Sequence, residues 1–133
     1  MEEELELEEL GEPEEVVSVR VVKPNLFLVC RRDMSLGQQL VQSSHVAIDF
    51  ILQYPEIAKE WRTTSNHIAA LSVKDEAALQ KLVTKAIEQN IKHVIFKEPD
   101  ANYSLTAIAF EPSEAAKKLC KKIMPTFWEG KLP

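Results

Sequence analysis

Glycine is scarce in this sequence, with only three residues, at positions 11, 37 and 130. Loops that bind phosphate through several backbone N–H groups need closely spaced glycines, so a Walker loop and similar phosphate cradles are excluded. A Gly-x-Ser-x-Gly elbow, which carries the serine nucleophile of many hydrolases, is also absent. Any hydrolytic chemistry must therefore use other groups.

Cysteine is rarer still, because Cys30 and Cys120 are the only two and no Cys-x-x-Cys pair exists. Cys30 falls in a predicted core strand and Cys120 on the inner side of a predicted helix. We therefore expect two buried thiols and no need for an oxidising compartment. His45, His67 and His93 lack the spacing of zinc ligands, so we expect no metal site, and nothing in the sequence calls for a cofactor.

Long apolar runs are missing too, since none approaches the ~18 residues needed to span a membrane. The first residues are acidic, unlike a secretory signal, so we expect a cytoplasmic protein without a membrane segment. Residues 1–15 contain nine glutamates and no lysine or arginine, which leaves 12 acidic and 16 basic residues in 16–133. We expect a flexible acidic tail (1–15) that aids solubility or competes with nucleic acid for a single basic domain (16–133).

Strands and helices alternate in the predicted domain. The run 26–30 is continuously apolar, which is typical of a strand covered on both faces. A helix is predicted from about Ser35 to Gln53, and its apolar spacing predicts an inner face made of Leu40, Val41, His45, Ile48, Ile51 and Leu52. Further strands are predicted at 67–73, 91–96 and 105–110, and further helices at 55–61, 75–90 and 113–124.

This order, β-α-β-α-β-β-α, predicts a three-layer α/β/α sandwich around a mixed four-stranded sheet. Strand–helix–strand units give parallel pairing, whereas the short link 97–104 predicts an antiparallel hairpin. The β-branched stretch 16–22 offers a possible extra N-terminal strand. The outer face of the last helix would carry four lysines, either solvated or in contact with nucleic acid: Lys117, Lys118, Lys121 and Lys122.

A small group of polar side chains is expected beyond the carboxyl ends of the strands, where open α/β sheets place their sites. Gln42 and His45 lie one helical turn apart, Asp100 follows the third strand, and Thr106 begins the fourth. A histidine, a carboxylate and a hydroxyl can position and activate water for ester hydrolysis. The alternative is structural, with a core histidine, a turn aspartate and an ordinary strand threonine.

Five short motifs follow one another in the order of a known family. They are LVCRRD ending at Asp33, Gln42-Ser43-Ser44-His45, Pro55-Glu56 with Trp61, Asp75-Glu76, and Thr106 with Pro112. Over residues 25–124 the sequence resembles type 2 peptidyl-tRNA hydrolases, and most closely their divergent peptidyl-tRNA hydrolase domain-containing branch. The resemblance implies an α/β sandwich, often a homodimer, that cleaves the ester between peptide and tRNA without a metal.

The resemblance implies tRNA or peptidyl-tRNA as the partner, but the cations differ from the family pattern. No lysine occurs between Lys23 and Lys59, where active members have lysines, and the glycine-rich loop is shortened to 99–104. Arg31, Arg32 and Lys97 are then the cations expected to contact phosphate. Two functions stay open: an esterase, or a catalytically silent module that binds tRNA or a protein.

Overall fold

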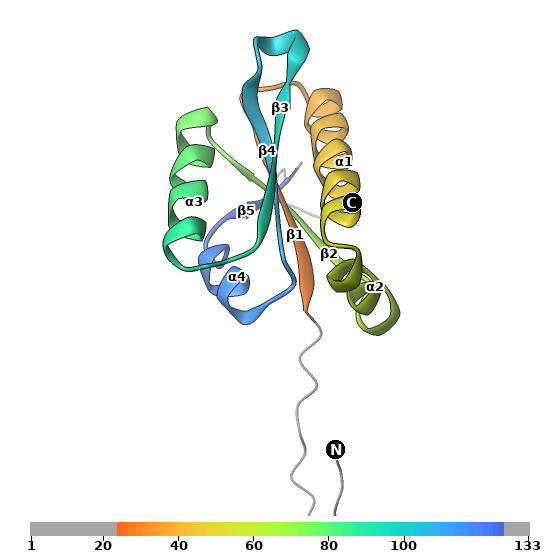
Figure 1. The fold of residues 1–133 in the computed structure, drawn as a ribbon. Helices are drawn as coiled ribbons and strands as arrows, with labels where there is room; N and C mark the ends of the chain where they lie inside the picture. Colours follow the sequence, from red (N-terminus) through yellow and green to blue (C-terminus); the bar gives the residue numbers. More distant parts are fainter. Residues whose placement is uncertain (1–23, 127–133) are drawn as a thin grey trace, which may run out of the picture.

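The computed structural model describes residues 24–126, which form a five-stranded sheet between two layers of helices (Figure 1). The predicted acidic tail (1–15), the possible strand (16–22) and the aromatic pair Phe127–Trp128 lie outside this range. The strand order across the sheet is β3-β4-β1-β2-β5. The strands are β1 (Asn25–Arg31), β2 (His67–Val73), β3 (His93–Glu98), β4 (Ser104–Phe110) and β5 (Met124–Pro125).

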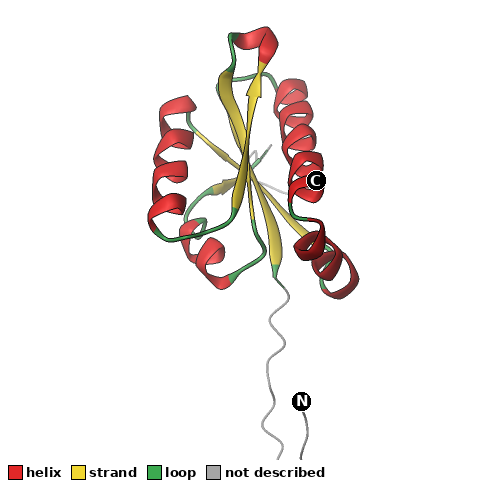
Figure 2. Cartoon of the chain, viewed as in Figure 1, coloured by secondary structure: helices red, strands yellow, loops and turns green. Residues whose placement is uncertain are grey.

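The sheet is mixed. β1 runs parallel to β2 and antiparallel to β4, and β3 and β4 form an antiparallel hairpin. The helices α1 (Leu36–Gln53) and α2 (Pro55–Thr64) lie on one side of the sheet, and α3 (Glu76–Glu88) and α4 (Glu114–Leu119) lie on the other (Figure 2). The predicted α/β/α sandwich and the order of its elements are thus confirmed, and the sheet has one strand more than predicted.

The additional strand corrects the prediction for the last helix. The helix ends at Leu119 instead of near residue 124, and the backbone then tightens through i−3 hydrogen bonds such as Ile123 N–H to Cys120 O (3.1 Å). Met124 and Pro125 pair antiparallel with β2, whose edge would otherwise present unpaired backbone groups. Lys121 and Lys122 therefore follow α4, and the four lysines do not form one helical face.

The central strand β1 confirms the prediction of a strand covered on both faces. Leu26, Leu28 and Cys30 pack against α1 and α2, and Phe27 and Val29 pack on the opposite side toward α3 and α4. All five residues are buried. Because residues 26–30 alternate between two apolar layers, the run has no polar position.

The orientation of α1 differs from the prediction. Its buried residues are Gln39, Gln42, Ser43, Val46 and Phe50. The residues expected to face inward are exposed instead: Leu40, Val41, His45, Ile48, Ile51 and Leu52. The reason is polar pairing, because the buried glutamines find hydrogen-bond partners in the sheet and the loop before the helix.

Candidate active site

The candidate site lies where α1 begins, beside the carboxyl end of β3. Ser35 is the N-cap of α1: its hydroxyl accepts the Gln38 backbone N–H at 3.2 Å, and the Gln38 side-chain oxygen accepts the Ser35 N–H at 3.0 Å. This capping box satisfies two backbone donors and fixes where the helix starts. The start of the helix determines how far along the sheet each later residue of α1 lies, including Gln42 and His45.

Gln42 joins three elements of the fold through its side-chain amide. Its oxygen accepts the Thr106 hydroxyl of β4 at 2.6 Å, and its nitrogen donates to the Glu98 carboxylate of β3 at 2.8 Å. Thr106 is fully buried and Gln42 is 4% exposed, so water cannot readily replace either partner. The structure therefore brings Gln42 and Thr106 together, as expected, and adds Glu98 to them.

The orientation of this amide follows from the chemistry of its neighbours. An ionised carboxylate only accepts hydrogen bonds, so the Gln42 NH₂ group must point toward Glu98. The amide oxygen is then directed at Thr106, whose hydroxyl donates to it and also lies 3.3 Å from the Phe96 carbonyl. The opposite orientation would set the amide oxygen against the carboxylate, which is unfavourable.

Glu98 stays ionised at neutral pH. The hydrogen bond from Gln42 lowers its pKa most, and the Asp100 backbone N–H, 3.1 Å from the second carboxylate oxygen, lowers it further. His45 is close enough to add a smaller effect in the same direction. The Glu98 anion is thus held in place by two hydrogen bonds, within electrostatic reach of the exposed His45 side chain.

His45 is exposed on α1 and stacks on Phe96 of β3, with ring centroids 4.5 Å apart and an angle of 9° between the rings. This stacking orients the imidazole plane, while the side chain as a whole stays exposed. Asp100 lies in the short 3₁₀ turn Pro99–Ala101 after β3 and is exposed. Among the described residues its carboxylate has no hydrogen bond, so its link to the cluster is through its backbone N–H.

The three expected phosphate-binding cations have different surroundings. The Arg31 guanidinium is bound by Asp33 at 2.7 and 2.9 Å, lies 4.0 Å from Glu76 and donates to the Leu105 carbonyl at 3.3 Å. Arg32 is exposed and donates to the Ser72 carbonyl at 3.0 Å. Lys97 is exposed at a β-bulge after Phe96 and lines a cavity on the α3 side of the sheet.

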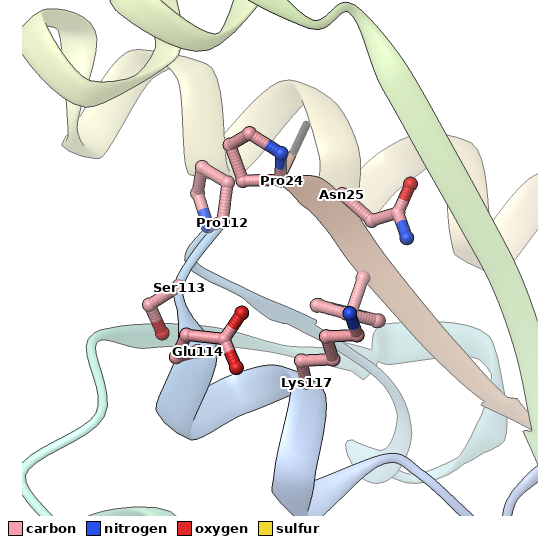
Figure 3. A pocket seen from close by; sticks show the side chains of 7 residues that line it. Pro24, Asn25, Pro112, Ser113, Glu114 and Lys117 are labelled. Carbon is pink, nitrogen blue, oxygen red and sulfur yellow. The ribbon is translucent and has the colours of Figure 1, made fainter. Parts of the chain in front are cut away.

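A cavity of about 240 Å³ lies at the other end of β1, away from the polar cluster (Figure 3). Its lining includes Pro24, Pro112 and the side chains of Glu114 and Lys117. Within residues 24–126, no group of three His, Cys, Asp or Glu side chains is arranged to hold a metal ion. In the same range no helix has the length and apolar character needed to cross a membrane.

Sequence reasoning did not identify Glu98. The third strand was predicted at 91–96, whereas β3 is His93–Glu98, so Glu98 was assigned to the following connection. One sequence signal points to it: it directly precedes Pro99, in the connection after a strand where open α/β sheets place their sites. Its side chain also accepts the Asp100 N–H, which caps the 3₁₀ turn.

The fold and this cluster define an α/β protein with a buried amide network that holds the half-buried Glu98 carboxylate near the exposed His45. The sequence model described as Peptidyl-tRNA hydrolase PTH2 matches residues 17–126, so the chain belongs to that family. A solved structure of a protein of unknown function from Agrobacterium tumefaciens strain C58 has a TM-score of 0.59 at 15% identity. The structural match includes 79% of this chain and 98% of the Agrobacterium chain, which supports the fold. No curated protein matches the chain significantly.

Proposed function

We propose that this protein hydrolyses the ester bond between the peptide and the tRNA of a peptidyl-tRNA, at the corner formed by His45, Glu98 and Gln42. Family membership supports the substrate class. The observation that carries the proposal is the Thr106–Gln42–Glu98 chain, which orients an ionised carboxylate beside His45. A carboxylate near an imidazole can position a water molecule and accept its proton.

In the proposed reaction, a water bound between Glu98 and His45 attacks the ester carbonyl carbon. Its proton passes to the His45 imidazole, and Glu98 stabilises the imidazolium that forms. The tetrahedral intermediate then breaks its bond to the ribose oxygen, which takes the proton from His45. The products are the free carboxyl group of the peptide and the hydroxyl group of the tRNA.

Thr106 and Asp100 have distinct proposed roles. Because Thr106 is fully buried and its hydroxyl is bound to Gln42, we assign it to positioning the amide, and not to direct contact with the water or the substrate. Asp100 stays a candidate partner of His45 in positioning the water, since its carboxylate is exposed in the turn next to Glu98.

The proposed contacts with tRNA phosphate involve Arg32 and Lys97, which are exposed. Arg31 can contribute only if phosphate competes with Asp33 for its guanidinium. This neutralisation favours the second candidate function, a catalytically silent module that binds tRNA or a protein, because less cationic charge remains at the corner.

A turnover assay on peptidyl-tRNA distinguishes the two functions. We expect wild type to release peptide, and Glu98→Gln and His45→Ala to lower kcat/KM at least about tenfold, the loss of ~1.4 kcal/mol of transition-state stabilisation. Glu88→Gln and His67→Ala are matched controls, since both residues are exposed and lie elsewhere. Asp100→Ala, compared with Glu98→Gln, identifies the carboxylate that contributes more.

Wild-type turnover indistinguishable from buffer would end the hydrolase proposal. Binding of deacylated tRNA that weakens steeply with salt, without ester cleavage, would favour the silent module. The homodimer and the cytoplasmic location remain predictions. Sedimentation equilibrium would test the first, by comparison with the 15.1 kDa chain mass, and imaging of the tagged chain would test the second.

A further inference from the structure

The side of the sheet that carries α1 is only partly covered. Exposed apolar side chains from three elements lie on it, and we call them the β2-side surface: Leu36, Leu40 and Ile51 of α1, Ile68 and Ala70 of β2, and Met124 of β5. Their exposed fractions, apart from Ala70, lie between 43% and 57%. None of the six residues is charged.

The strand residues of this surface face α1 because of the sheet register. Ile68 and Ala70 of β2 pair with Leu26 and Leu28 of β1, and paired residues point to the same side of a sheet. Leu26 and Leu28 pack against α1 and α2. Met124 pairs with Ser72, the β2 partner of Cys30, and therefore points to this side as well.

The helix residues of the surface turn toward β2. Gln42 contacts Thr106 of β4. Gln39 lies about 60° away from Gln42 around the helix axis, and its side-chain oxygen is 3.6 Å from the Cys30 sulfur of β1. This rotation therefore leads from β4 toward β1. Rotation by roughly another 60–120° in the same sense reaches Leu36, Leu40 and Ile51. Since β2 is the next strand after β1 in that direction, these three residues lie on the side of α1 that is turned toward β2.

The last described residue, Thr126, lies at the edge of this surface. Its backbone N–H donates to the Ala70 carbonyl at 2.9 Å, and its hydroxyl lies 3.8 Å from the Cys30 sulfur. Cys30 belongs to the α1 side of the core, so the Thr126 side chain points to this side of the sheet. The next two residues are Phe127 and Trp128.

We propose that Phe127 and Trp128 pack on the β2-side surface of their own chain. Two residues span at most about 7 Å, so the Trp128 side chain can contact only what surrounds Thr126. A phenylalanine and a tryptophan each bury roughly 150–250 Å². Together they match an apolar patch of a few hundred Å², about the largest that monomers usually expose.

Tryptophan fluorescence tests this proposal, because the chain has only two tryptophans. In Trp61→Phe, Trp128 is the only emitter. We expect a blue-shifted emission and an acrylamide quenching constant about threefold below that of a free tryptophan amide, since the indole is covered. If Trp61→Phe does not fold, 5-fluorotryptophan labelling of the full chain gives the same information, and Trp128→Phe identifies the Trp128 fluorine signal.

Leu40→Asp is the decisive variant, with Leu52→Asp as its matched control. Both residues are exposed leucines of α1, at 57% and 74%, but only Leu40 belongs to the β2-side surface. We expect Leu40→Asp to shift the Trp128 emission to the red and raise its quenching, and Leu52→Asp to change neither.

Three outcomes would overturn the proposal. Trp128 could be quenched like a free tryptophan, or Leu40→Asp and Leu52→Asp could have equal effects. The protection of Trp128 could also disappear on dilution in parallel with a fall in mass, which would assign the surface to a second copy. Protection that is independent of protein concentration and lost in Leu40→Asp supports packing within one chain.

Discussion

Thr106→Val is the sharpest test of the amide network, because it removes one hydroxyl and keeps the shape of the side chain. The Gln42 oxygen, which accepts that hydroxyl at 2.6 Å, would be left without its donor. Gln42 is 4% exposed, so its oxygen cannot reach water unless the side chain moves.

The magnitude follows from this burial. An unsatisfied buried acceptor costs about 1–3 kcal/mol, and the methyl group that replaces the hydroxyl offsets up to about 0.8 kcal/mol. We expect the free energy of unfolding to fall by about 1–2 kcal/mol, roughly a 5- to 30-fold lower ratio of folded to unfolded protein. Urea unfolding followed by circular dichroism measures this difference.

A double-mutant cycle isolates the hydrogen bond. Gln42→Leu with Thr106→Val removes both partners, so the double variant should be more stable than the sum of the two single losses predicts, by at least about 0.5 kcal/mol. Thr106→Ser keeps the donor and should keep the coupling. An unfolding midpoint of Thr106→Val equal to wild type, or strict additivity in the cycle, would refute this account of the network.

Three further predictions concern packing, pH and thiol chemistry. Phe50→Ala should lower the free energy of unfolding by about 3–5 kcal/mol, because Phe50 is 1% exposed. Leu52→Ala should change it by less than about 0.5 kcal/mol. Equal losses in urea unfolding would contradict the observed orientation of α1. The hydrogen bond from Arg31 lowers the pKa of Asp33 below its ordinary 3.8. The ionised carboxylate therefore stabilises the fold above about pH 4, and this stabilisation is lost as the pH falls through the lowered pKa. Asp33→Asn should thus lose less than about 1 kcal/mol at pH 6 and match wild type near pH 2 in urea titrations; a constant difference across this range would contradict the assignment. Burial raises the pKa of Cys120 to about 12, so the native thiol should react with DTNB at pH 8 at least about 100-fold more slowly than in guanidinium; equal rates would show that it is accessible.

The sequence predicts some parts of this protein well for identifiable reasons. The five-residue apolar run of β1 has few alternatives to a doubly covered strand, and Asp75 caps α3 as expected, its carboxylate accepting the Ala78 N–H at 3.0 Å. β5 could not be predicted, because two residues carry no periodic signal and their pairing depends on the free edge of β2.

The sequence did not predict the orientation of α1 or the hydrogen bond between Gln42 and Glu98, and the reason is different. Apolar spacing assigns hydrophobic residues to the core, whereas Gln39 and Gln42 are buried here because their amides are satisfied, Gln39 by the loop before α1 and Gln42 by two distant strands. Those partners include Glu98, which is 56 residues away from Gln42. Only the tertiary structure reveals such pairs.

The central position of β1 has a consequence for synthesis on the ribosome. Both strands that pair with β1 come later: β2 about 40 residues on, and β4 about 80 residues on. At ~5–20 residues per second, an apolar strand with open edges waits roughly 4 to 16 s for β4 to be translated. Chains arrested before residue 104 should therefore be captured by chaperones, and chains released beyond residue 126 should escape them. During translation the strand that later forms the centre of the sheet is the part that most needs protection.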